Sequence, residues 1–191
     1  MKIQEICSIT SGLVLSRKKA ENNLNPSKIY KLLTIKSFEN DFSINHNELE
    51  DFSAESDIDN KYITKKGDII VRLTFPYTAV YIDSLEEGLL ISSNFLVLRN
   101  ILNKFLPEYL TIVLNSENFQ KKLAQISTGT KIPVIKVSSF NEIEFGSICP
   151  IEIQSKIIGV YKEHLNELNL LEQLTSQKKT LIKTLLNKYI E

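Results

Sequence analysis

The chain has 191 residues, 23 basic and 23 acidic side chains, and a hydrophobic fraction of 42%, which is enough for a folded core. No run of 18 apolar residues exists, which excludes a membrane-spanning helix. Two cysteines without a CxxC pair indicate a reduced, cytoplasmic protein. His46 and His164 are too few and too far apart for a zinc site, so we expect no metal and no cofactor.

The zero net charge conceals a strong segregation of charge along the chain. Residues 39–59 contain eight acidic residues and no Lys or Arg. The remaining residues up to 150 contain 17 basic and 10 acidic residues, and residues 151–191 contain six Lys and five Glu. A basic face is therefore available if the acidic segment points elsewhere, although charges of this kind also simply solvate surfaces.

The first half of the chain is typical of β-structure. The β-branched and aromatic residues of 28–38 predict a strand that leaves into a polar loop. Residues 61–64 are expected to be extended, and residues 65–68 form a turn. The continuous apolar run of 69–73 predicts a strand that is buried on both faces. Pro76 ends this strand, and residues 78–82 form the next one.

The second half continues with strands and then changes to helical periodicity. A turn at residues 86–88 precedes expected strands at residues 89–91 and 95–98. Pro107 opens a helix that extends to residue 114, and Ser116 is the N-cap of a second helix that ends before residues 127–130. Residues 142–145 are expected to be extended. We therefore predict an α+β body over residues 1–149.

Residues 150–191 predict one long helix after the body. Pro150 suits a helix start, and no further proline follows. At about 1.5 Å per residue this helix is roughly 55–60 Å long, which is longer than a body of this size can cover. Its apolar residues mostly recur at steps of three and four, and we expect them to contact a partner: Ile157, Tyr161, Leu165, Leu168, Leu171, Leu174, Leu181, Leu185 and Tyr189.

Motifs of catalysis are missing from the sequence. It has neither GxGxxG nor GxxxxGK[ST], which argues against a nucleotide site. It also has neither HExxH nor GxSxG. Asp57 and Asp59 have no third candidate ligand near them, so a solvated acidic loop explains them better than a metal site. We therefore expect no enzymatic activity from this chain alone.

Several short motifs follow one another in a defined order and spacing between residues 60 and 190. They are the GDIIVR turn and strand (67–72), ISSNF and VLR (91–95 and 97–99), LPEYL (106–110), STGT (127–130) and PIEIQ (150–154). In this order and spacing the chain resembles a half-length specificity subunit of type I restriction–modification systems. The first 60 residues match only in general layout.

The resemblance implies a non-catalytic DNA-recognition subunit with one target recognition domain and one spacer helix. Its partners would be double-stranded DNA and a modification subunit that carries the cofactor and the chemistry. Because the usual member has two domains and two helices, the resemblance implies a homodimer whose helices pair as an antiparallel coiled coil. Identical halves related by a twofold axis predict a palindromic two-part target.

Loops that carry both basic and hydrogen-bonding side chains are the candidates for DNA contact, because phosphates set affinity and base edges set sequence. The candidates are Arg17, Lys18, Lys19, Lys36, Ser37, Arg72, Thr74, Tyr77, Ser92, Ser93, Asn94, Thr128, Gly129, Thr130 and Lys131. Each has a structural alternative: Lys18 and Lys19 suit a solvated turn, Arg72 could pair with a buried carboxylate, and Tyr77 could belong to the core.

Other functions remain open from the sequence. A coiled-coil scaffold with a protein-binding body fits the long helix. A silent, truncated specificity fragment fits the single domain. A nuclease-like enzyme is the third alternative, and metal-dependent cleavage by the pure chain would support it.

Overall fold

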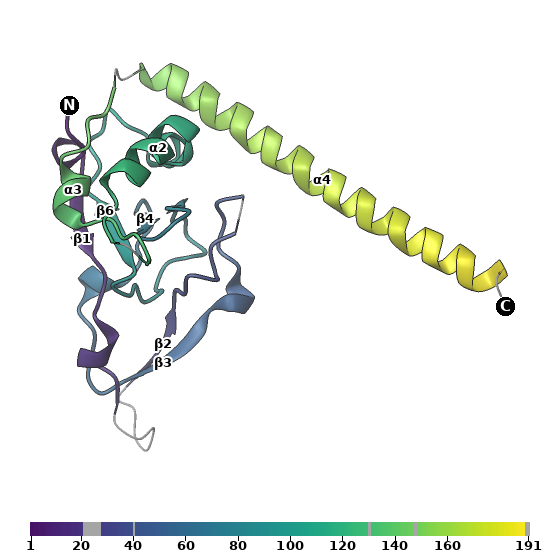
Figure 1. Cartoon of the computed structure of the whole chain (residues 1–191), viewed down its shortest axis with the longest axis horizontal. Helices are drawn as coiled ribbons and strands as arrows, with labels where there is room; N and C mark the ends of the chain where they lie inside the picture. Colours follow the sequence, from purple (N-terminus) through teal and green to yellow (C-terminus); the bar gives the residue numbers. More distant parts are fainter. Residues whose placement is uncertain (21–27, 40, 130, 147–148, 190–191) are drawn as a thin grey trace.

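The computed structural model describes residues 1–20, 28–39, 41–129, 131–146 and 149–189. It consists of a body of strands and short helices, from which one long helix, α4 (Ile151–Tyr189), projects away (Figure 1). The α+β fold expected from the sequence is confirmed. Within the described residues, no helix combines the length and the apolar composition that crossing a bilayer requires.

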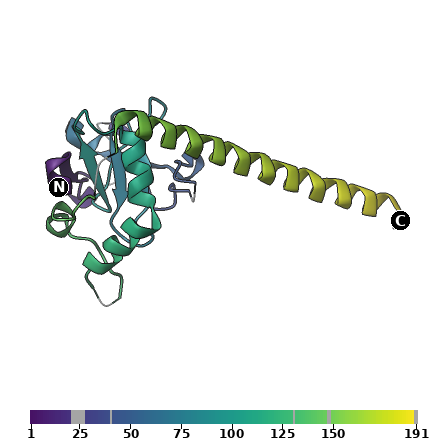
Figure 2. The same cartoon turned by 90° about the horizontal axis from the view of Figure 1, so that it is seen from above.

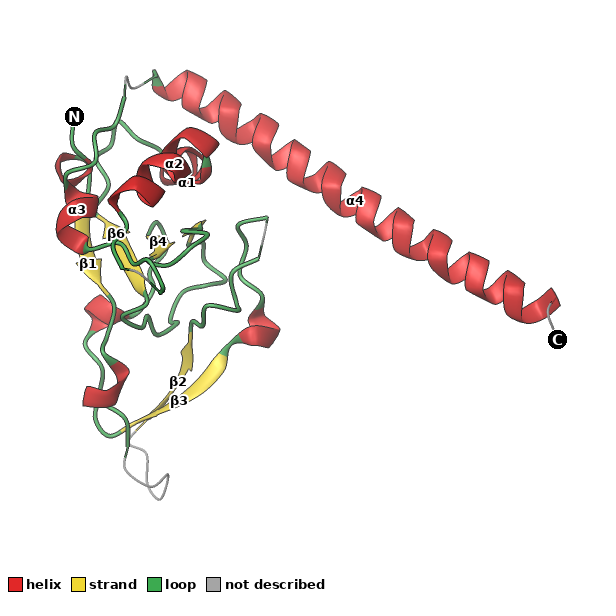
Figure 3. Ribbon diagram, in the orientation of Figure 1, coloured by secondary structure: helices red, strands yellow, loops and turns green. Residues whose placement is uncertain are grey.

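The body is built on a four-stranded antiparallel sheet with the order β1-β6-β4-β5, of which β1, β6 and β4 are labelled in Figure 3. The strands are β1 (Ser8–Ser11), β4 (Ile69–Arg72), β5 (Ala79–Tyr81) and β6 (Phe95–Arg99). Side chains of β4 alternate between two cores, because successive residues of a strand point to opposite faces. Ile69 and Val71 pack in one core and Ile70 in the other, which explains the continuous apolar run.

Three helices cover one face of the sheet. They are α1 (Pro107–Asn115), α2 (Glu117–Ile126) and α3 (Val137–Asn141). The proline stands in the first turn of α1, and the side chain of Ser116 accepts a hydrogen bond from the amide of Phe119, as the sequence predicted. Buried Leu110, Leu123 and Phe140 join the first core.

A two-stranded ribbon lies beside the sheet. Strand β2 (Lys28–Leu32) pairs antiparallel with β3 (Glu50–Ala54), so that five residues of the acidic segment are tied to β2. Short 3-10 helices occur at η1 (Ile3–Glu5), η2 (Leu15–Arg17), η4 (His46–Glu48) and η5 (Asn60–Tyr62). The segment after β2 covers the second face of the sheet, where Phe38 stacks on Phe95 at 4.9 Å between ring centres.

A buried ion pair joins two of the sequence motifs. The guanidinium of Arg99 donates from Nε to Asp68 Oδ1 at 2.7 Å and from Nη2 to Asp68 Oδ2 at 2.6 Å. The same Nη2 donates to the carbonyl of Ile63 at 2.8 Å, and the Asp68 side chain is only 2% exposed. The Asp of the GDIIVR motif and the Arg of the VLR motif therefore fasten the start of β4 to the end of β6.

The first turns of α4 are fixed to the body by specific contacts. Gln154 is completely buried and bonds to the backbone at Leu106 N, Lys104 O and Cys149 O, all within 2.9 Å. Tyr161 stacks on Phe42, with ring centres 6.3 Å apart. From residue 166 to residue 189 every side chain is exposed. The structure thus divides α4 into an anchored part and a free part (Figure 2).

The structure corrects three local predictions. Residues 61 and 62, which were expected to be extended, belong to the short helix η5. The strand expected at residues 89–91 forms only isolated bridges, at Leu90. Within residues 142–145 a single bridge links Glu144 to Lys2. The sequence reading also missed β1, β3 and α3, which depend on partners far away in the chain or are only one turn long.

Candidate nucleic-acid interface

Three polar segments meet at one end of the central sheet, where β4 ends and β6 begins. The amide of Leu73 donates to Asn94 O, and the amide of Ile135 donates to Leu73 O, both at 3.0 Å. Thr128 and Val134 exchange backbone bonds of 3.1 and 3.0 Å. We call residues 72, 74–76, 93–94, 128–129 and 131–134, which are exposed or partly exposed, the sheet-end surface; the last two ranges belong to the same loop after α2.

The sheet-end surface combines candidates from separate parts of the sequence. It contains Arg72, Thr74, Asn94, Thr128, Gly129 and Lys131, with exposed Ser93 beside Asn94. Backbone bridges join Val134 to both Thr74 and Thr128, so the loop after α2 lies against the end of β4. The sequence could name these residues but could not show that they share one surface.

The charge of this surface favours anions. Its segments contain Arg72 and Lys131 and neither Asp nor Glu. Arg72 is partly buried and its Nε donates to Thr74 Oγ1 at 3.1 Å, while burial lowers the pKa of the guanidinium below its ordinary value. Among the described residues no carboxylate forms an ion pair with Arg72. The buried-carboxylate alternative for Arg72 therefore does not hold, since Asp68 pairs with Arg99.

Gly129 allows the loop to turn back on itself. Its φ is +126°, a conformation that L side chains rarely adopt. A Cβ at this position would lie 3.0 Å from the carbonyl oxygen of Ile132. The backbone conformation at this position therefore favours glycine. Thr130 lies outside the described residues.

Burial removes three candidates from the set. Ser37 is completely buried, and its hydroxyl donates to the carbonyl of Thr34 at 2.8 Å. Tyr77 is 3% exposed and belongs to the first core. Ser92 is also 3% exposed, and Gly12 approaches its carbonyl so closely that a Cβ on Gly12 would be 2.1 Å from the oxygen. These three side chains are buried in the body, so they are not exposed for contact with a duplex in this structure.

The basic cluster at residues 17–19 lies elsewhere. Lys18 Nζ donates to Ser56 Oγ at 2.9 Å, and Lys19 forms a backbone bridge with Ala54 of β3. Both lysines are thus placed beside the acidic segment, whereas Arg17 is exposed. Lys36 is exposed on the segment that follows β2. None of these four residues is joined to the sheet-end surface by the contacts described above.

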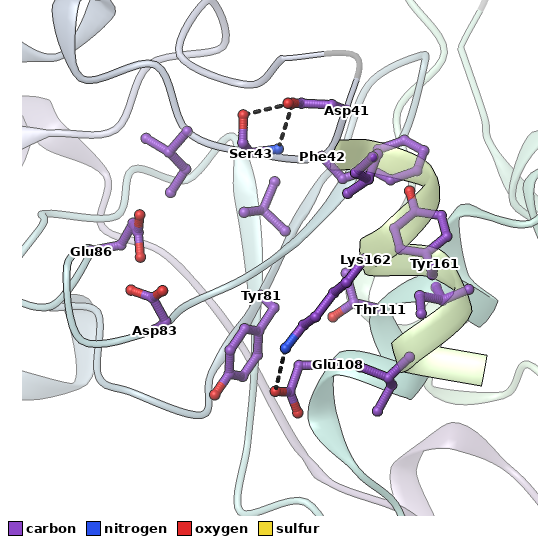
Figure 4. A pocket seen from close by; sticks show the side chains of 15 residues that line it. Asp41, Phe42, Ser43, Tyr81, Asp83, Glu86, Glu108, Thr111, Tyr161 and Lys162 are labelled. Atoms are coloured by element: carbon purple, nitrogen blue, oxygen red, sulfur yellow. Dashed lines mark hydrogen bonds and ion pairs between the residues drawn. The ribbon is translucent and has the colours of Figure 1, made fainter. Parts of the chain in front are cut away.

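A cavity of about 240 Å³ lies where α4 meets the body (Figure 4). Its apolar walls include Val80, Ile112 and Ile158. Four carboxylates line it, from Asp41, Asp83, Glu86 and Glu108, together with the single cation Lys162, whose Nζ is 3.8 Å from Glu108 Oε1. Burial and the neighbouring Asp83 raise the pKa of Glu86. This acidic lining does not suit a phosphate backbone.

The described residues also contain no cluster that could hold a metal ion. The body does expose cations, hydroxyls and amides. Such groups neutralise phosphates and reach base edges.

The free part of α4 exposes large apolar side chains. Leu168, Leu171, Leu174, Leu181 and Leu185 are each between 43% and 58% exposed. Tyr161 and Leu165, which the sequence assigned to a partner interface, instead line the cavity beside the body together with Ile158. In the anchored turns of α4, the side of the helix that carries these two residues faces the chain's own body, and both are partly buried there.

The comparisons with known proteins find a likeness in structure alone. No family model and no curated protein sequence matches the chain. The HsdS subunit from Thermoanaerobacter tengcongensis matches with a TM-score of 0.69 and 16% identity, over 98% of this chain and 47% of that one. A chain from a study of complex assembly and conformational transition of the type I R-M system matches with a TM-score of 0.65 and 13% identity, over 97% and 42%.

A third match is the type I restriction-modification system S subunit from M. genitalium, with a TM-score of 0.57 and 17% identity, over 93% of this chain and 42% of that one. At such identities the likeness concerns the fold. The chain spans less than half the length of each of these three structures.

Proposed function

We propose that the chain is a DNA sequence-recognition subunit of a type I restriction–modification complex, without catalytic activity of its own. The observation that carries the proposal is the match to the HsdS subunit, which extends over 98% of the chain and so includes both the body and α4. The other two matches, to chains of the same kind of system, support it.

The body would read DNA through the sheet-end surface. Its two cations, Arg72 and Lys131, suit phosphates, and both lack a carboxylate partner among the described residues. Thr74, Asn94 and Thr128 provide the hydroxyl and amide groups that bond to base edges. The surface thus combines cations that provide affinity for DNA with polar groups that select the base sequence.

The free part of α4 would pair with α4 of a second copy. A stripe of half-exposed leucines over several turns is typical of a coiled-coil seam. In an antiparallel pair the two bodies lie at opposite ends. Residues 166–189 are about 36 Å long at the rise of an α-helix, which is close to one turn of B-DNA. Two identical bodies at such a separation would read a palindromic two-part target with a fixed gap.

The proposal is tested by the methylome of a host that expresses the neighbouring modification subunit. The methylated motifs are compared between cells with the chain and cells without it. A palindromic two-part motif that depends on the chain is the expected result. A non-palindromic motif would replace the homodimer by pairing with a different recognition subunit. Absence of any new motif would contradict the proposal as a whole.

The exposed α4 favours one second candidate, a coiled-coil scaffold whose body binds protein. A silent specificity fragment would behave in the same way in the methylome. The purified complex with the modification subunit distinguishes them: a scaffold forms the complex yet shows no preference among duplexes, whereas a silent fragment forms no complex.

A further inference from the structure

Large apolar side chains are exposed within the sheet-end surface. Phe75 is 73% exposed, Ile132 is 67% exposed and Val134 is 38% exposed. They belong to two segments that the backbone joins, since Thr74 bridges Val134 and Leu73 O accepts from Ile135 N. These apolar residues were not among the candidates that the sequence suggested, because an apolar side chain in a loop gives no signal of its exposure.

The packing of the body does not require Phe75 to be a large aromatic residue. Its described aromatic contact is an edge-to-face arrangement with Tyr77, with ring centres 6.0 Å apart. Tyr77 itself is buried in the first core, and so a smaller residue at position 75 leaves that core filled. An exposed apolar group within a polar surface is typical of a binding site.

The surroundings of Phe75 identify the kind of partner. Arg72 lies three residues before it and Lys131 stands next to Ile132, while the surface contains no Asp or Glu. Leu85 provides the contrast: it is 79% exposed, but its turn carries Asp83, Glu86 and Glu87. A partner of Phe75 must therefore combine negative charge with apolar contacts, as a DNA duplex does.

We infer that Phe75 and Ile132 form an apolar contact that reads thymine by its 5-methyl group in the major groove, flanked by phosphate contacts from Arg72 and Lys131. The inference rests on the proposed DNA-reading function and names the residues that determine one base of the target. In the major groove only the T·A pair presents a methyl group, and phenylalanine is among the residues that contact it.

The size of the effect follows from the group that is buried. Burial of one methyl group corresponds to a factor of about four in an equilibrium constant. Replacing the required thymine by uracil should therefore weaken binding of the wild-type complex about fourfold. Phe75→Ala should remove this difference, because the apolar contact to the methyl group is gone.

The experiment uses the complex of the full chain with its modification subunit, in two readouts. The methylomes of wild type, Phe75→Ala, Phe75→Leu and the control Leu85→Ala are compared position by position. Each thymine of the wild-type target is then replaced by uracil in a synthetic duplex, and binding of wild-type and Phe75→Ala complexes is measured by fluorescence anisotropy.

We expect Phe75→Ala to accept other bases at one thymine position while the rest of the motif persists. Phe75→Leu should retain part of the preference, and Leu85→Ala should leave the motif unchanged. An unchanged motif for Phe75→Ala, or a wild-type target in which no thymine-to-uracil replacement weakens binding, overturns the inference. The uracil scan needs no variant, so a misfolded variant does not obscure it. If the wild-type chain directs no methylation motif at all, the proposed function itself is contradicted. That outcome differs from failure of the inference about Phe75, in which the wild-type motif is present.

Discussion

The ion pair between Asp68 and Arg99 should be the most sensitive polar contact of the body. Arg99→Met removes the cation and leaves the Asp68 carboxylate, which is 2% exposed, with the amide of Lys65 as its described donor at 2.8 Å. An unpaired buried carboxylate is strongly disfavoured. The hydrogen bond to Asp68 also raises the pKa of Arg99 above its ordinary value.

The magnitude follows from burial. Breaking a buried pair by removing one partner costs about 3–5 kcal/mol. The Arg99 side chain is 21% exposed, so water reaches the pair and we expect a loss of about 3 kcal/mol, at the lower end. With a urea m-value of about 2 kcal/mol per molar, the midpoint of unfolding should fall by about 1.5 M.

The assay is urea unfolding followed by tyrosine fluorescence. The chain has seven Tyr and no Trp, and most of these report on the body, whereas the 39 residues of α4 dominate the helical circular dichroism signal. The control is Lys121→Met, which breaks an exposed ion pair with Glu117 and should cost less than about 0.5 kcal/mol.

Equal stability of Arg99→Met and Lys121→Met would refute the reasoning. It would mean that water or another cation compensates Asp68 in the variant. A partial loss could arise from the missing bond to Ile63 O alone, and Asp68→Asn in the Arg99→Met background separates these causes. If the buried charge is responsible, the second change restores stability.

Three further predictions concern the helix and the surface. Leu168→Glu with Leu185→Glu should convert the proposed dimer into a monomer with an intact body, as measured by light scattering, whereas the exposed control Asn166→Glu, which leaves every leucine of α4 in place, should remain dimeric; a dimeric double variant would exclude this face as the interface. Lys131→Ala should weaken binding to all duplexes and lower the salt slope by about one, and a changed sequence preference would contradict the phosphate assignment. Burial and, to a smaller extent, the negative charge of Asp41 raise the pKa of Tyr161 to about 12. The contribution of the neutral phenol to stability is therefore complete below pH 10 and is lost as the pH rises from 10 to 12. Tyr161→Phe should make the fall in stability over this window shallower in urea unfolding, and an unchanged slope would show that the phenol does not titrate as stated.

The elements that the sequence predicted correctly are those whose signals are local. Helix α4 follows Pro150 and has no proline within it, and its hydrogen bonds lie within the helix itself. The cap at Ser116 depends on an amide three residues away. Strand β4 was recognised because both of its faces are buried, which leaves a continuous apolar run.

The missed strands depend on distant partners. Strand β1 is short and mostly exposed, and it becomes a strand because residues of β6 pair with it across nearly 90 positions of sequence. Strand β3 lies in the acidic segment, whose charges obscured its alternation, and it is fixed by β2. In both cases the sequence contains the residues but not the pairing.

The sequence by itself determined the types of side chain, the buried strand and the long helix with its unpaired leucines. Only the tertiary structure decided which candidates are exposed. It buried Ser37, Tyr77 and Ser92, turned Tyr161 and Leu165 towards the body, and exposed Phe75 beside Arg72 and Lys131. The physical reason is that helices and turns are specified by bonds a few residues apart, whereas exposure depends on which distant segments cover a side chain.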